Sequence, residues 1–205
     1  MDSFVQLLSM AFALFLLMDP IGNVPIFISV LKDIDPKRHQ YIIFRELVIA
    51  LIIIIAFDFL GDLLLEFLNV EQATLLIAGG IILFIIALKM IFPGRRDPDV
   101  DISPDKEPFI VPLAIPLVAG PAVLAAVILY SHEQYNEWIT IGAIILAWIA
   151  STIILLSASY LKKLLGWRGL VACERLMGLL LILISVQMFL NGLILFLGPH
   201  GSLGQ

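Results

Sequence analysis

Two short segments of this chain carry the same arrangement of proline and glycine within apolar surroundings. They are DPIGNVPIF, residues 19–27, and IPLVAGPAV, residues 115–123. Each has two prolines five positions apart that enclose a glycine, and these residues are Pro20, Gly22 and Pro25, then Pro116, Gly120 and Pro121. Proline removes a backbone N–H and crowds the carbonyl four residues earlier, so each segment predicts a break in a helix.

A broken helix exposes backbone N–H groups at the start of its second half, where the positive end of the dipole suits a carboxylate. In a bilayer such breaks persist only where protein or a water-filled cavity surrounds them. Interrupted apolar segments at corresponding places in two halves of a chain point to a transporter's substrate site. We therefore predict that Gly22, Gly120 and Pro121 lie at a binding site for a small zwitterion or anion near the membrane midplane.

Asp19 and Asn23 are the polar residues of the first segment. An acidic residue within a membrane span is costly and marks a candidate functional site. Asp19 is expected either to cap freed backbone N–H groups or to bind a coupling cation or a substrate ammonium group. Asn23 is expected to cap the second half-helix, to contact the substrate, or both. The second segment has no acid or amide, so a shared site would take its charge from the first.

Three further polar residues in apolar stretches are candidates for a transport pathway. Gln187 and Asn191 are one helical turn apart and share a face, which suits either an interhelical hydrogen bond or the lining of a pathway. Glu46 is near the start of another apolar stretch, where it is expected to pair within the bundle or to line the pathway.

The composition is that of a membrane protein. Of the 205 residues, 61% are hydrophobic and 14% are charged, with a mean hydropathy of +1.07, whereas about a quarter of residues are charged in soluble domains. A single transmembrane domain over residues 1–205, surrounded by a lipid bilayer, is expected. The lone Cys173 excludes an internal disulfide framework and a metal site built from cysteines.

Six stretches are long enough to cross a bilayer, which requires about 20 apolar residues. They are roughly 4–31, 41–60, 72–92, 109–130, 138–161 and 172–196. All 12 Lys and Arg residues fall in or beside the first, third and fifth connections between these stretches. Because positive residues favour the cytoplasmic side, the sequence predicts an all-α, multi-pass membrane protein with six transmembrane helices and both termini outside, in the periplasm.

The second half of the chain is predicted to repeat the first in the opposite orientation. Residues 80–90, GIILFIIALKM, align without a gap with residues 178–188, GLLLILISVQM, at an offset of 98, and the proline segments are offset by 96. Since each half has three spans, an odd number, the halves would form a 3+3 inverted-topology repeat. The expected organisation is repeat one at about 1–96, a cytoplasmic linker at about 93–108, repeat two at about 109–197 and a polar tail at 198–205.

Motifs for catalysis or ATP use are missing from the sequence. There is no G-x-x-x-x-G-K-[ST] loop, no H-E-x-x-H and no G-x-S-x-G. We expect no enzymatic activity, cofactor, metal site or nucleic-acid partner. Any driving force would come from a gradient of Na⁺, of H⁺ or of the substrate itself. Faces of small residues permit a homo-oligomer without requiring one.

Four segments resemble those of the MarC family of prokaryotic inner-membrane proteins, and together they cover nearly the whole chain. They are FLLMDPIGNVPIF (15–27), IAGGIILFIIALKM (77–90), PLAIPLVAGPAVL (112–124) and ERLMGLLLILISVQMFLNGL (174–193). The resemblance implies a six-span protein of the inner membrane, grouped with small neutral amino acid transporters. It also implies that the motif residues are Asp19, Pro20, Gly22, Asn23, Pro25, Pro116, Gly120 and Pro121.

Together these observations favour a secondary transporter of a small neutral amino acid such as alanine or glycine. Rocking of one half against the other would expose the site to each side in turn. Two alternatives remain open: export of another small solute, and a non-transport role as an intramembrane enzyme or an assembly factor.

Overall fold

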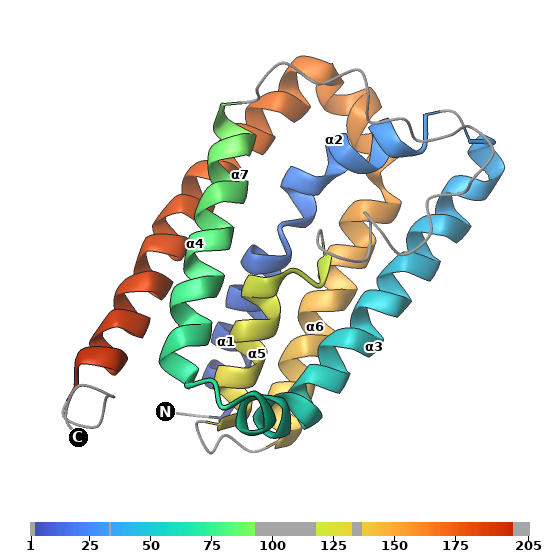
Figure 1. The fold of residues 1–205 in the computed structure, drawn as a ribbon. Helices are drawn as coiled ribbons and strands as arrows, with labels where there is room; N and C mark the ends of the chain where they lie inside the picture. Colours follow the sequence, from blue (N-terminus) through green and yellow to red (C-terminus); the bar gives the residue numbers. More distant parts are fainter. Residues whose placement is uncertain (1–2, 33, 93–117, 133–136, 199–205) are drawn as a thin grey trace.

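The computed structural model describes residues 3–32, 34–92, 118–132 and 137–198, and these residues are almost entirely helical (Figure 1). Within these ranges there are seven helices and no strand. The helices are α1 (Ser3–Met18), α2 (Pro20–Val30), α3 (Pro36–Leu68), α4 (Gln72–Ile91), α5 (Pro121–His132), α6 (Glu137–Leu156) and α7 (Ala158–Leu197). Four stretches of the described chain are long and apolar enough to cross a membrane, namely α1 with α2, α4, α6 and α7.

The first apolar stretch is broken, as the prolines predict. α1 ends at Met18 and α2 begins at Pro20, with Asp19 between them at φ 43° and ψ 56°, in the left-handed region. The break predicted at Pro25 is wrong, because Pro25 lies inside α2, which continues to Val30. A proline at the first helical position costs nothing, because its missing N–H would have no partner in the helix.

The second proline segment also contains the start of a helix. α5 begins at Pro121, and the two preceding residues, Ala119 and Gly120, are not helical. Pro116 lies outside the described residues, as do the predicted linker at 93–108 and the tail beyond Gly198.

α3 is longer than the apolar stretch 41–60 because both of its ends are capped. The Asp35 side chain accepts a hydrogen bond from the Lys37 N–H at 3.0 Å, and Pro36 occupies the first helical position. At the other end Asn69 adopts the left-handed conformation that commonly terminates helices.

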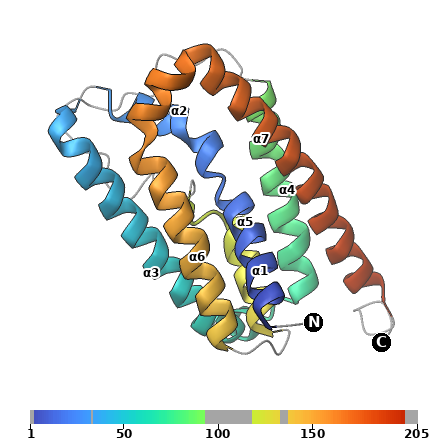
Figure 2. The same cartoon turned by 180° about the vertical axis from the view of Figure 1, so that it is seen from behind.

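α7 is also longer than predicted, because the connection expected before residue 172 is helical. The helix starts at Ala158, and Gly166 departs from helical geometry with φ 64° and ψ 175°. Figures 1 and 2 show that the segment before this glycine runs across one end of the bundle, whereas the rest of α7 runs along it. The predicted connection is therefore reduced to a kink at Gly166 between two helical segments.

The helices form two packed groups that share α5. Val123 and Val127 of α5 belong to the apolar core built with α1, α2, α3 and α6, whereas Ala122 and Ala125 belong to the core built with α4 and α7. α4 and α7 lie side by side and antiparallel (Figures 1 and 2). Packing on both faces places the start of α5 in the middle of the molecule.

Glycines allow α4 and α7 to approach closely. A Cβ atom at Gly80 would lie 2.9 Å from the Ser185 carbonyl oxygen. A Cβ atom at Gly178 would lie 3.2 Å from the Ala87 carbonyl oxygen. Larger residues at these positions would separate the two helices.

The two ends of the bundle differ in charge. α2 ends, α3 begins, α4 ends and α7 begins at one end, uppermost in Figure 1, whereas α1 begins and α7 ends at the other. The described Lys and Arg residues lie in the loop or helix portions nearer the first end, and they are Lys32, Lys37, Arg38, Arg45, Lys89, Lys162, Lys163, Arg168 and Arg175. We call this the basic end.

Candidate functional site

The break between α1 and α2 places a strained acidic residue in the interior. Asp19 is only 5% exposed, and its backbone lies in the left-handed region that costs most L-residues about 1–2 kcal/mol. Aspartate tolerates this conformation better than most residues, because its short side chain can form local hydrogen bonds. Strained backbone of this kind is often found at binding sites, which makes the break a candidate.

Two side chains of the break satisfy backbone groups that it frees. Asp19 Oδ1 accepts a hydrogen bond from the Gly22 N–H at 3.0 Å, so it caps α2. The Asn23 side-chain amide donates to the Met18 carbonyl at 3.0 Å, which serves the last residue of α1. The capping role considered for Asp19 is therefore observed. The Asn23 amide thus serves the end of the first half-helix, and Asp19 serves the start of the second.

The second carboxyl oxygen of Asp19, Oδ2, does not cap the helix. Within the described part of the chain, Oδ2 makes no hydrogen bond. A Cβ atom at Gly22 would collide with this oxygen and with the terminal methyl of Met90. Gly22 is thus required by close packing around the carboxyl group, and it does not line the cavity described next.

A cavity of about 120 Å³ joins the two proline segments. Asp19 and Asn23 line it from the first segment, and Gly120 and Pro121 from the second. The remaining wall is largely apolar and consists of Leu17, Ile26, Leu83, Ile86, Met90, Ala122 and Leu181. A cavity of roughly 150 Å³ can hold benzene, so this one suits a solute of only a few heavy atoms.

The start of α5 supplies unpaired backbone donors beside this cavity. Pro121 has no N–H, and Gly120 before it has no side chain that could act as a cap. The Leu124 N–H donates to the Gly120 carbonyl at 3.0 Å, but the N–H groups of Ala122 and Val123 have no hydrogen-bond acceptor within the described chain. This helix end therefore keeps its partial positive charge for a ligand.

The two helix ends at the cavity are electrostatically different. The Asp19 carboxyl group occupies the N-terminus of α2, so a carboxylate ligand would be repelled there. At the N-terminus of α5 no acidic side chain of the described residues acts as a cap, so this end would attract a carboxylate. The cavity thus offers an acidic group from one break and backbone donors from the other, an arrangement that suits a small zwitterion.

Gln187 and Asn191 are not part of this cavity. The Gln187 side-chain amide donates to the Asn191 side-chain oxygen at 2.8 Å, so the pair bonds within α7, and the predicted interhelical hydrogen bond is wrong. Both residues line a different cavity of about 510 Å³, together with Ser9 and Phe12 of α1.

Glu46 also lies away from the central cavity. It is completely buried in α3, and its Oε1 accepts hydrogen bonds from Arg45 at 2.8 and 3.0 Å. Its second oxygen has no hydrogen-bond partner in the described chain. The predicted pairing is therefore present, with the neighbouring residue as partner.

Sequence reasoning missed the apolar part of the site. Leu83, Ile86 and Met90 of α4 and Leu181 of α7 shape the wall opposite the breaks. Leucine, isoleucine and methionine occur throughout these helices, so residue type alone does not distinguish lining positions from packing or lipid-facing ones. The recurrence of Met90 and Met188 in the aligned repeats was the only available signal, and it does not indicate a role.

Comparison with known proteins places the chain among bacterial membrane proteins. A family profile described as MarC family integral membrane protein matches residues 4–197. The UPF0056 inner membrane protein YhgN of Escherichia coli is 49% identical over 189 residues, which cover 92% of this chain and 96% of that protein. No solved structure matches the chain.

Other relatives align over nearly the same length. A UPF0056 membrane protein of Buchnera aphidicola is 48% identical, covering 92% of this chain and 96% of its own. A UPF0056 membrane protein of Chlamydia pneumoniae is 36% identical, covering 91% and 93%. These names describe a membrane location and no substrate.

Proposed function

The chain belongs to the MarC family of integral membrane proteins, and from this premise we propose that it is a secondary transporter of small neutral amino acids such as alanine or glycine. The observation that carries the proposal is the cavity of about 120 Å³ at which both helix breaks meet. Buried irregular backbone in a membrane protein is tolerated around such a cavity and is typical of transporter substrate sites.

The substrate would bind with a defined polarity. Its carboxylate would accept hydrogen bonds from the N–H groups of Ala122 and Val123 at the start of α5. Its ammonium group would contact Asp19 Oδ2, which has no other partner in the described chain. The small volume and the apolar wall would restrict the side chain to one of glycine or alanine size.

Alternating access would follow from an inverted repeat of two three-helix halves. The sequence alignment pairs Gly80 with Gly178 and Ala87 with Ser185. In the structure Gly80 of α4 contacts Ser185 of α7, and Gly178 of α7 contacts Ala87 of α4. Replacing each residue of the first contact by its aligned partner gives the second contact. A pseudo-two-fold axis between these antiparallel helices accounts for this reciprocity.

The full topology would comprise six spans in the bacterial inner membrane. α3, with 33 residues, and the stretch that ends in α5 would add to the four apolar stretches long enough to cross. The basic end would face the cytoplasm, so both termini would be periplasmic. Transport would be coupled to Na⁺ or H⁺ without a cofactor or a catalytic step, and a homo-oligomer is compatible with this arrangement.

Counterflow in sealed proteoliposomes tests the function. Vesicles loaded with unlabelled alanine should transiently accumulate labelled alanine, and external glycine should compete. Asp19→Asn keeps an oxygen that can cap α2 but removes the charge for the ammonium group. This variant should lose roughly tenfold or more of the rate, because hydrogen bonds to charged groups contribute about 1.5–3 kcal/mol.

Asp35→Asn provides a matched control. Asp35 also caps a helix that begins with proline, and its hydrogen bond to the Lys37 N–H has the same 3.0 Å length as that of Asp19. It lies outside the cavity, so its variant should transport normally. Normal transport by folded Asp19→Asn would contradict the ammonium contact. A well-folded wild type that moves no neutral amino acid would contradict the substrate class and favour another solute or a non-transport role.

A further inference from the structure

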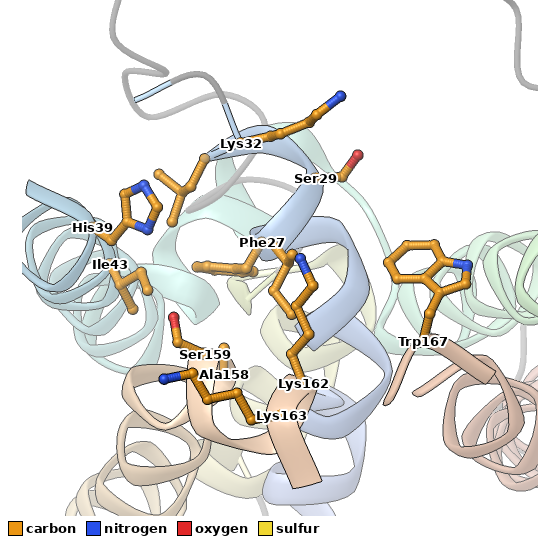
Figure 3. Close-up of a pocket in the computed structure, with 12 residues that line it drawn as sticks. Phe27, Ser29, Lys32, His39, Ile43, Ala158, Ser159, Lys162, Lys163 and Trp167 are labelled. Carbon is orange, nitrogen blue, oxygen red and sulfur yellow. The ribbon is translucent and has the colours of Figure 1, made fainter. Parts of the chain in front are cut away.

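A second cavity lies beside α2 at the basic end of the molecule (Figure 3). Its volume is about 730 Å³, and it is bounded by α2, the start of α3 and the start of α7. It shares no lining residue with the cavity of about 120 Å³. The proposed transport function therefore leaves it without a role.

The margin of this cavity is cationic. Lys32 follows α2, and Lys162 and Lys163 belong to the first turns of α7 (Figure 3). No Asp or Glu is present among the described residues that line the cavity. The whole chain has a formal net charge of −5, whereas the described lining of this cavity is positively charged. Lysine ammonium groups are common ligands of phosphate.

The floor of the same cavity is apolar. Phe27 is completely buried, and Ile43 and Ala158 are 4% and 3% exposed. An inorganic anion would gain nothing from such a floor, because burying apolar surface stabilises only ligands that are themselves partly apolar. A cationic margin above an apolar floor suits an amphiphile with an anionic head.

The segment of α7 before Gly166 has the composition of an interfacial helix. Tyr160 and Leu164 are 67% and 70% exposed, close to the exposed Lys162 and Lys163. Exposed aromatic and basic residues together are typical of segments that lie at the level of the lipid headgroups. The mouth of the cavity would thus lie at headgroup depth.

We propose that this cavity binds an anionic phospholipid, with its phosphate held by Lys162 and Lys163 and the upper part of its acyl chains over Phe27 and Ile43. Basic pockets between membrane helices recognise lipid phosphates in this way. The proposal does not depend on the transport function.

Native mass spectrometry of the detergent-solubilised protein tests the site. The protein is titrated with phosphatidylglycerol and with phosphatidylcholine of the same acyl chains. Wild type should retain the anionic lipid preferentially, and Lys162→Gln/Lys163→Gln should weaken that binding roughly tenfold or more, since each surface Lys contributes about 1 kcal/mol. Lys37→Gln/Lys89→Gln removes two exposed charges from the same end outside the cavity and should retain the preference.

A second readout uses Trp167, which lines the cavity. Brominated phosphatidylglycerol should quench the fluorescence of wild type more than that of Trp167→Phe. Equal loss of lipid binding in both lysine pairs, or no preference in wild type, would overturn the proposal. Displacement of the lipid by millimolar inorganic phosphate, without quenching of Trp167, would assign the cavity to a soluble anion and would also overturn it.

Discussion

Asp19 combines a structural and a proposed binding role in one side chain. One carboxyl oxygen caps α2 through the Gly22 N–H, and the other makes no hydrogen bond within the described chain. Asp19 is also one of the residues that line the cavity. Asn23 is more firmly tied to structure, because its side-chain amide satisfies the Met18 carbonyl. Asn23→Ala would therefore disturb folding and binding together, whereas Asp19→Asn separates them.

Gly22→Ala should destabilise the protein through overpacking. The new methyl group would collide with the Asp19 carboxyl group and the Met90 methyl, which predicts a loss of roughly 1–3 kcal/mol. Thermal unfolding in detergent measures this. Gly142→Ala is the control, since its Cβ would meet only the Leu7 side chain, at 3.1 Å. Equal unfolding temperatures for the two variants would contradict the packing role of Gly22.

At the scale of helices, two ends of similar sequence have different electrostatic characters. α2 and α5 both start with a proline that has a glycine nearby. An acidic side chain caps α2, whereas no side chain of the described residues caps α5. A carboxylate is therefore expected at α5 alone. The close pair α4 and α7 forms the wall that both helix ends face.

The contact between α4 and α7 predicts unequal effects of alanine at its two glycines. A Cβ at Gly80 would meet backbone atoms of Ser185 and Phe189, both at 2.9 Å, so the helices would have to separate. At Gly178 all the nearest atoms are farther away, with Ile91 Cγ1 at 3.0 Å, Met90 Cβ at 3.1 Å and the Ala87 carbonyl oxygen at 3.2 Å, so a smaller adjustment suffices. Gly80→Ala should thus lower the unfolding temperature more than Gly178→Ala, and the reverse order would be inconsistent with this packing.

At the scale of the whole molecule, charge distinguishes two ends of an otherwise apolar bundle. The described Lys and Arg residues gather toward one end, where α2, α4 and α7 meet (Figure 1). The start of α1 and the end of α7 share the opposite end. This arrangement makes the proposed orientation testable with single cysteines.

Cysteine labelling in intact cells tests the orientation. In a Cys173→Ser background, Ser3→Cys should react with a membrane-impermeant maleimide supplied to the periplasm. Lys163→Cys, at the basic end, should react only after the inner membrane is permeabilised. Labelling of Lys163→Cys in intact cells would contradict the proposed orientation and indicate the opposite one. Labelling of both after permeabilisation controls for accessibility.

Much of the helical framework could be predicted because its causes are local. Long apolar runs require helices in a bilayer, and Pro20 breaks the first of them as expected. The lengths of α3 and α7 could not be read from hydropathy, since α3 is extended by the Asp35 cap and α7 continues through the bend at Gly166. These features depend on individual hydrogen bonds and backbone angles that average hydropathy does not register.

The sequence by itself determined the membrane class, the break at Asp19 and the residue types available to a site. It left open which groups are free to bind a ligand. Only the tertiary structure decided that the Gly22 N–H is already occupied, and that Gln187 and Asn191 line a separate cavity. It also decided that no described residue accepts a hydrogen bond from the Ala122 and Val123 amides at the start of α5. The physical reason is that a backbone group can bind a ligand only if no closer acceptor satisfies it, and folding determines which groups are close.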